Sequence, residues 1–221
     1  MERHFDEELT ALKNQILEMG AITERMVSDV LKALMERDGS ILKSIEENEN
    51  TVNRMQMEID ECCLKLIALH QPTANDLRLL MGVSKINAEL ERVGDHALNI
   101  SKLVTAIIEH EQLKPFIDLP KMVEIARGMF KESLRAFVEL DVDKATSILL
   151  RDDQVDELRN KIVDELIQFM CGDSSTVQVA LRIILLANNL EKIADHATNI
   201  AEVVIFVAQG KDIRHHAEPL T

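Results

Sequence analysis

Two stretches of the chain carry the same polar residues at the same spacing, and these residues are its best candidates for chemistry. The stretches are 89–104 (ELERVGDHALNISKLV) and 189–204 (NLEKIADHATNIAEVV), which are offset by 100 residues and identical at eight of 16 positions. A repeat kept only for packing would let its polar positions drift, whereas here Glu, Asp, His and Asn are retained as well. Self-similarity at a fixed offset predicts two copies of one structural unit.

The repeated carboxylates have the spacing of neighbours on one face of a helix. Glu91 and Asp95 lie four residues apart, and so do Glu191 and Asp195. Such side chains are roughly 5–6 Å apart, and two ionised carboxylates there repel each other by about 0.2–0.5 kcal/mol. A divalent metal ion that prefers oxygen ligands would offset this repulsion. The spacing therefore predicts metal binding, and the competing interpretation is solvated acids on exposed helix faces.

The rest of the sequence predicts the helices that position these pairs. Tyr and Trp are absent, and the chain has 7 Gly and 4 Pro, which favours long helices around an aliphatic core. Apolar residues recur at intervals of three and four, which predicts helices over about 8–37, 40–69, 73–111, 122–140, 143–170 and 175–208. Pro115 and Pro120 mark the boundary between two halves. We therefore predict an all-α protein of two pseudo-symmetric three-helix bundles, 1–114 and 115–221.

The charge and cysteine content exclude several classes of protein. With 25 basic and 39 acidic residues, the net charge of −14 disfavours binding to nucleic acid or sustained attachment to an anionic bilayer, and it attracts cations. No apolar run reaches the roughly 18 residues that a membrane span needs, and no signal peptide is visible, so we expect a cytoplasmic protein. Cys62, Cys63 and Cys171 form no disulfide framework, and we expect reduced side chains packed like small hydrophobic residues.

The motifs of common enzymes are absent, so we expect a non-enzymatic protein. The sequence has neither a Gly-x-x-x-x-Gly-Lys-Ser/Thr phosphate loop nor a Gly-x-Ser-x-Gly nucleophile motif. Each Glu of the repeat precedes its His by five residues, whereas ferritin-like di-iron sites use Glu-x-x-His. A metal-dependent phosphohydrolase or a carboxylate-bridged metal oxidase stays open as an alternative, because bound metal activates water. A metal-free helical adaptor is the other alternative.

Four elements, taken in order, resemble the PhoU family of phosphate-uptake regulators from bacteria and archaea. They are RHFDEELTALKNQILEMG near the start, HQPTANDLR at 70–78, LERVGDHALNI and LEKIADHATNI, and the resemblance covers nearly the whole chain. It implies a twin three-helix bundle that acts in the cytoplasm as a negative regulator of phosphate uptake and of the phosphate-starvation response. It also implies partners, which are the ATPase subunit of the phosphate ABC transporter and a sensor histidine kinase.

The resemblance further implies multinuclear metal sites built by Glu/Asp-x-x-x-Asp pairs on neighbouring helices. The middle helix of each half is expected to face the repeated pair, and aligning Val52 with Val155 matches Glu49 and Asn53 to two aspartates of the second half. The expected ligands of Fe, Mn, Zn or Mg ions are Glu49, Glu91, Asp95, Asp152, Asp156, Glu191 and Asp195. Asn53 replaces a carboxylate by a neutral amide, so the first half should bind metal more weakly, bind fewer ions, or bind none.

The remaining polar residues of the repeat are expected to support these sites. His96 and His196 each follow an Asp and are rotated by about 100° from it on a helix, which predicts interhelix hydrogen bonds or contacts behind the ligands. Asn99 and Asn199 could either bind the metal directly or hydrogen-bond a carboxylate that binds it. The last helix is apolar almost all round, so one bundle is not expected to bury all of its surface. We therefore expect a homodimer, in which a second copy buries the rest.

Overall fold

The computed structural model describes residues 2–110, 113 and 118–214, and all the regular secondary structure within these ranges is helical. The α-helices are α1 (Glu2–Glu36), α2 (Ile45–His70), α3 (Ala74–Ile108), α4 (Asp118–Glu139), α5 (Val142–Leu149), α6 (Asp152–Gly172) and α7 (Val177–Gln209). Two short 3₁₀ segments, η1 (Gly39–Ser44) and η2 (Ser174–Thr176), precede α2 and α7. The predicted all-α class is confirmed.

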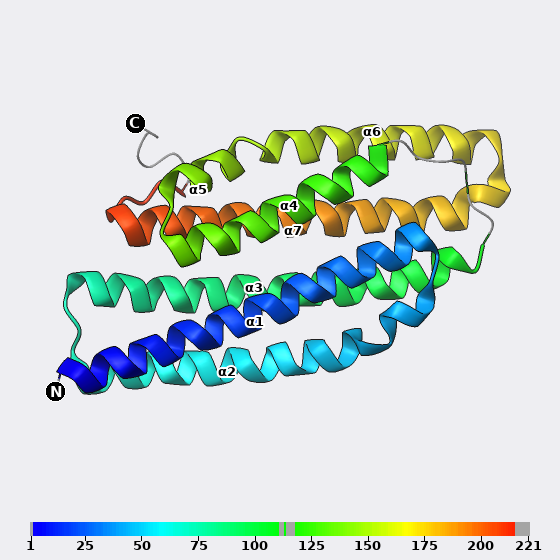
Figure 1. Ribbon diagram of the computed structural model, residues 1–221. Helices are drawn as coiled ribbons and strands as arrows, with labels where there is room; N and C mark the ends of the chain where they lie inside the picture. The colour runs from blue at the N-terminus through cyan, green and yellow to red at the C-terminus, as the bar shows by residue number, and fades with distance from the viewer. Residues whose placement is uncertain (1, 111–112, 114–117, 215–221) are drawn as a thin grey trace.

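The helices form two bundles that lie side by side (Figure 1). The first contains α1, α2 and α3, and the second contains α4, α7 and the pair α5 and α6, which follow one another along one edge. Helices α3 and α7 run in opposite directions through the middle and make the most extensive contact between the halves. The two-bundle prediction is therefore confirmed, while the predicted boundary between 114 and 115 lies outside the described residues.

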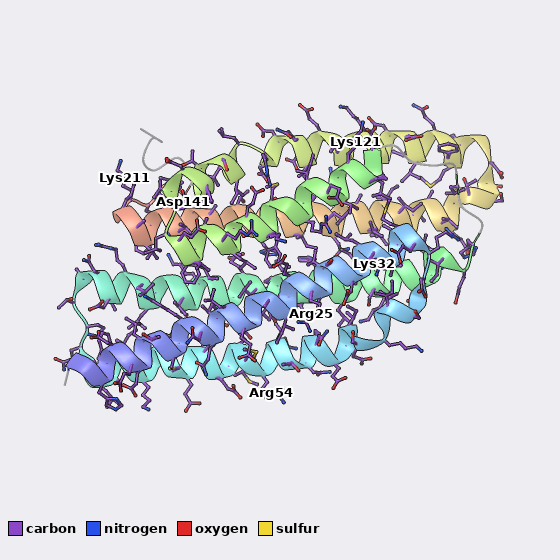
Figure 2. The ribbon with its side chains drawn as sticks, in the orientation of Figure 1. Arg25, Lys32, Arg54, Lys121, Asp141 and Lys211 are labelled. Atoms are coloured by element: carbon purple, nitrogen blue, oxygen red, sulfur yellow. The ribbon has the colours of Figure 1, made fainter. Side chains whose placement is uncertain are left out.

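The single helix predicted over 143–170 is wrong, because the chain forms two helices that are interrupted at Leu150 and Arg151. Asp141 caps α5 by accepting from the backbone N–H of Lys144 at 3.0 Å, as its position in the sequence suggests (Figure 2). At the interruption, the backbone N–H of Arg151 bonds the carbonyl of Ile148 at 3.0 Å, which is a tighter turn than an α-helix makes. The Arg151 side chain bonds Glu132 of α4 at 2.9 Å, so a tertiary contact holds the break.

Smaller differences concern helix starts and one cysteine. The first helix begins at Glu2 rather than near residue 8, and the segment predicted to start the second helix is the 3₁₀ turn η1. Cys63 is buried and Cys62 is half-buried, but Cys171 is exposed, so the expectation of three packed cysteines is wrong for Cys171. Over the described residues, no helix is apolar for the length that a membrane crossing requires.

One aliphatic core runs through both halves and fixes the spacing of α3 and α7. Every helix from α1 to α7 contributes buried side chains, and most of α7 is covered within the chain. Gly82 of α3 lies so close to α7 that a Cβ atom there would be 2.3 Å from Cγ2 of Val207. This close approach brings the two repeated stretches, which lie midway along α3 and α7, against each other.

Candidate metal centre

The second half gathers four carboxylates on the neighbouring helices α6 and α7. Asp152 and Asp156 lie on α6, and Glu191 and Asp195 lie on α7. Burial raises the pKa of Asp152 to about 6, and the negative charges of Asp195, Asp156, Asp153 and Glu191 add to this shift. The predicted ligands of this half therefore share one acidic surface.

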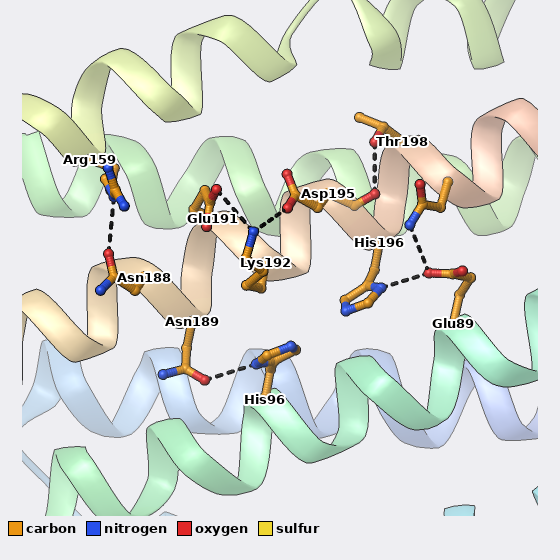
Figure 3. A network of polar contacts seen from close by, with 11 residues as sticks. Glu89, His96, Arg159, Asn188, Asn189, Glu191, Lys192, Asp195, His196 and Thr198 are labelled. Carbon is orange, nitrogen blue, oxygen red and sulfur yellow. Dashed lines mark hydrogen bonds and ion pairs between the residues drawn. The ribbon is translucent and has the colours of Figure 1, made fainter. Parts of the chain in front are cut away.

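A lysine lies between the two carboxylates of α7. The Nζ atom of Lys192 is 2.7 Å from Oδ2 of Asp195 and 3.2 Å from Oε1 of Glu191 (Figure 3). Hydrogen bonding to Asp195 raises the pKa of Lys192, so this side chain stays a cation. Among the described residues, Asp152 and Asp156 form no ion pair of this kind, which leaves the α6 carboxylates without a basic partner.

The first half gathers fewer charges in the corresponding place. Burial raises the pKa of Glu91, and Asp95 and Glu49 contribute, whereas Arg92 opposes the shift. Arg92 lies 3.6 Å from Glu91 and 3.7 Å from Asp95. The three predicted ligands of this half, Glu49, Glu91 and Asp95, therefore also lie on one surface, between α2 and α3.

Asn53 gives the first half a polar atom that lacks a partner. Its Nδ2 donates to Oε1 of Glu49 at 2.6 Å, while its Oδ1 is buried without a hydrogen-bond partner. A buried acceptor of this kind is costly unless a donor or a cation satisfies it. The amide oxygen is thus available to a cation next to Glu49, although it lacks the charge of a carboxylate.

The donor sets of both surfaces fit a hard divalent cation, because they consist of carboxylate and amide oxygens. Within the described part of the chain, however, no three His, Cys, Asp or Glu side chains converge closely enough to enclose an ion. The structure brings the seven predicted ligands into two acidic surfaces, one per half, and metal binding by them stays a prediction.

The two histidines of the repeat join the halves, which confirms the predicted interhelix hydrogen bonds. His96 of α3 contacts Oδ1 of Asn189 through Nδ1 at 2.8 Å, and His196 of α7 donates from Nδ1 to Oε2 of Glu89 at 2.6 Å (Figure 3). The two imidazole rings lie 5.3 Å apart. Asn199 also donates to Glu89, at 3.1 Å. These contacts form the polar centre of the α3–α7 interface.

Glu89 and Asn189 are the hydrogen-bond partners of the two histidines, and the sequence analysis missed them. They occupy the same position of the repeat, and each precedes its histidine by seven residues, which places it on the same helix face two turns away. Because α3 and α7 are antiparallel, each histidine meets the partner position on the other helix. The seven-residue interval, present in both copies, is the signal that could have identified them.

The fold defines a class of all-α proteins made of two related three-helix units. The PhoU domain model matches the chain twice, at residues 16–104 and 119–204. The chain belongs to the PhoU family.

Relatives of known name match nearly the whole chain. The phosphate-specific transport system accessory protein PhoU of Escherichia coli K12 is 35% identical over 211 residues, which are 96% of this chain and 88% of that protein. The PhoU homolog of Pseudomonas putida is 33% identical over 96% of this chain and 84% of that protein.

Solved structures of the family have the same fold. The crystal structure of PhoU from Pseudomonas aeruginosa superposes with a TM-score of 0.90 at 33% identity, covering 94% of this chain and all of that one. The structure of the phosphate transport system regulatory protein PhoU from Streptococcus pneumoniae has a TM-score of 0.86 at 28% identity, covering 94% and 98% of the two chains. The resemblance inferred from the sequence is confirmed.

Proposed function

We propose that this protein is a non-enzymatic negative regulator of phosphate uptake and of the phosphate-starvation response. In this role it couples the ATPase subunit of a phosphate ABC transporter to a sensor histidine kinase in the cytoplasm, beside the membrane and without crossing it. The observation that carries the proposal is the match of both halves to PhoU accessory proteins over 96% of the chain. The residues of each acidic surface fall within one of the two ranges that match the PhoU domain model.

Deletion of the gene tests the regulatory role directly. At high external phosphate, the deletion strain should express phosphate-starvation genes that the parent strain keeps silent, and the intact gene supplied in trans should restore silence. Unchanged expression in the deletion strain would refute the regulatory role. Co-purification of the tagged protein with the transporter ATPase and with the kinase tests the two partners separately.

We propose further that the acidic surfaces bind divalent ions. Asp152, Asp156, Glu191 and Asp195 hold them in the second half, and Glu49, Glu91 and Asp95 do so more weakly in the first. A bound ion would offset the negative charge that Lys192 and Arg92 leave uncompensated. Support comes from Asp152, whose pKa is raised by burial and by the neighbouring carboxylates, and from Asn53, whose buried Oδ1 has no hydrogen-bond partner.

Elemental analysis of protein purified without a histidine tag or chelator tests this part. One or more equivalents of Fe, Mn, Zn or Mg should be present in the wild type and should decrease in the double variant Asp152→Ala plus Asp195→Ala. The matched first-half variant, Glu91→Ala plus Asp95→Ala, should lose less metal. If no metal is bound after incubation with each ion, the metal proposal is refuted. The regulatory proposal then depends only on contacts with the partner proteins.

We also propose that the protein acts as a homodimer. Leu181 and Leu185 are 49% and 50% exposed and lie four residues apart on one face of α7, so they offer an apolar area for a second copy. Light scattering coupled to size exclusion should give twice the mass of one chain. Leu181→Glu should give a monomer if this area forms the contact.

A further inference from the structure

A pocket of about 220 Å³ lies where the two halves meet, between α1, α3 and the C-terminal end of α4 (Figure 1). Its deeper part is apolar, because it is lined by Leu17, Leu79 and Phe137, which pack in the common core. Val138 and Leu140 line it as well, at the end of α4, and both are exposed. An aliphatic group gains free energy by leaving water for surroundings of this kind.

Leu140 has a backbone conformation that normally belongs to glycine. Its φ is 49°, in the left-handed region, where a Cβ atom is crowded by the following carbonyl oxygen. The backbone N–H of Asp141 bonds the carbonyl of Ala136 at 3.0 Å, and a helix that ends in this way usually has glycine at the position of Leu140. The leucine side chain gains little from the core in return, since it is 42% exposed. The fold alone therefore does not account for a leucine here.

The first half contains the same helix ending and shows what such a residue does when it supports the fold. Arg37 directly follows α1 as Leu140 follows α4, its φ is 54°, and the corresponding backbone hydrogen bond is 3.1 Å long. Its guanidinium donates to the carbonyls of Ile108 and His110, so the side chain ties α1 to the end of α3. Leu140 has no polar group for such a contact, and it lines the pocket instead.

The side of the pocket formed by α1 is polar and carries a positive charge. Thr10, Lys13 and Asn14 line it, and their intervals of three and four residues place them on the same helix face as Leu17. Lys13 is exposed and forms no ion pair with any residue that the structure describes. The pocket thus combines apolar walls with one ammonium group that has no counter-ion.

The acids closest to the pocket in the sequence are neutralised by another lysine. Glu139 and Asp141, which flank Leu140, both bond Lys144. Lys13 therefore remains available to an anion, although the net charge of the chain is −14.

We propose that this pocket binds a small aliphatic carboxylate, whose chain contacts Leu79, Phe137 and Leu140 and whose carboxylate pairs with Lys13. The volume sets the size, because an apolar cavity of about 150 Å³ takes benzene and pockets for drug-sized molecules begin at about 300 Å³. A chain of about six to eight carbon atoms lies between these limits. Both halves line the pocket, so the ligand contacts both bundles at once. The proposal is independent of metal binding by the acidic surfaces.

Titration with hexanoate, followed by NMR of protein with ¹³C-labelled leucine and valine methyl groups, tests the site and the affinity together. The methyl signals of Val138 and Leu140 should shift as hexanoate is added. Hexanoate should bind about fifteenfold more tightly than butanoate, since each buried CH₂ contributes a factor of about four. Methyl signals of Val138 and Leu140 that stay in place, or equal affinities for the two carboxylates, would overturn the proposal.

The role of Lys13 is tested by comparing hexanoate with hexan-1-ol, which has the same chain without the charge. Lys13→Gln should weaken hexanoate binding by up to about fivefold, the scale of an exposed charge pair, and leave the alcohol unaffected. Lys32→Gln is the matched control, because Lys32 is an exposed lysine of the same helix that pairs with no acid among the described residues. Equal hexanoate affinities in the two variants would overturn the assignment of an anionic ligand.

Leu140→Gly separates binding from folding. Glycine suits the left-handed backbone, so the variant should unfold at the same temperature as the wild type or at a higher one. Its affinity for hexanoate should fall about fivefold, because part of the apolar lining is removed. Arg37→Gly is the matched control in the first half, and it should unfold at a lower temperature while its hexanoate affinity stays unchanged. A Leu140→Gly protein that is less stable than the wild type but binds hexanoate equally well would overturn the proposal.

Discussion

His196 of α7 donates to Glu89 of α3 at 2.6 Å, and this contact lies in the middle of the interface between the halves. Asn199 shares the same carboxylate oxygen, at 3.1 Å. Glu89→Ala removes the acceptor of both groups while they remain partly buried, so the variant should lose about 1–3 kcal/mol of unfolding free energy. Urea unfolding at neutral pH measures this loss. Glu157→Ala, at an exposed glutamate of α6, should change stability by less than about 0.5 kcal/mol, and equal effects of the two variants would contradict the role of Glu89.

The close approach of α3 and α7 makes Gly82 sensitive to a single methyl group. Alanine normally stabilises a helix by about 1 kcal/mol relative to glycine, but in Gly82→Ala the Cβ would lie 2.3 Å from Val207. Overpacking should outweigh the helix preference and cost about 1–3 kcal/mol, measured by thermal unfolding. The second change Val207→Ala should recover part of the loss.

Gly172 provides the matched control for this experiment. It is the last residue of α6, and a Cβ there would meet no atom within 4 Å. Gly172→Ala should therefore leave stability unchanged or slightly raised. A Gly82→Ala protein that is as stable as Gly172→Ala would show that α7 shifts to make room.

Asp152 should make the stability of the metal-free protein depend on pH. Its pKa is about 6 in the folded protein against a usual value of 3.8, so the folded state holds the proton more tightly than the unfolded chain. The resulting stability is present below about pH 4 and is lost as the pH rises through about 6. In chelator at pH 7.5, Asp152→Asn should exceed the wild type by roughly 1 kcal/mol after allowance for solvent screening, and the difference should vanish near pH 4.

Asp164→Asn is the control for the pH series, since Asp164 is an exposed aspartate of the same helix. Its difference from the wild type should be small and constant with pH. A pH-independent difference for Asp152→Asn would show that its carboxyl is not protonated preferentially in the folded state.

The three cysteines should react in a fixed order. Cys171 is exposed, Cys62 is half-buried, and burial raises the pKa of Cys63 to about 12, which leaves almost no thiolate at neutral pH. A disulfide reagent should modify Cys171 first, Cys62 slowly, and Cys63 only after unfolding. Mass spectrometry of the peptides at successive times gives the order, and early modification of Cys63 would indicate that α2 opens locally.

The features that the sequence predicted are those set by local spacing. The Glu91–Asp95 and Glu191–Asp195 pairs could be predicted because residues four apart lie on the same face of a helix, and because the same pair occurs in both copies of the repeat. Asp152 and Asp156 have the same interval but were chosen with the help of the family resemblance, and Glu49 required the alignment of the halves as well. In each case the residues that form the surface lie on neighbouring helices of one bundle.

The features that the sequence missed depend on contacts between distant segments. The break before Asp152 has neither Gly nor Pro, and the side chain of Arg151 is held at that break by its bond to Glu132 on α4. The pairing of Glu89 with His196 requires α3 and α7 to be antiparallel neighbours, which no local pattern specifies. The bridging position of Lys192 was visible in its spacing, but that spacing equally suits an ordinary surface lysine.

The reciprocal contacts of His96 and His196 make the chain an intramolecular dimer. Two similar units meet across α3 and α7 through an interface that separate polypeptides would form only at sufficient concentration. Because both units belong to one polypeptide, the effective concentration of one unit around the other is high and does not fall when the protein is diluted. The sequences of the two units can therefore differ, as they do at Glu89 and Asn189. The linked chain still pairs its first unit with its second rather than with a copy of itself.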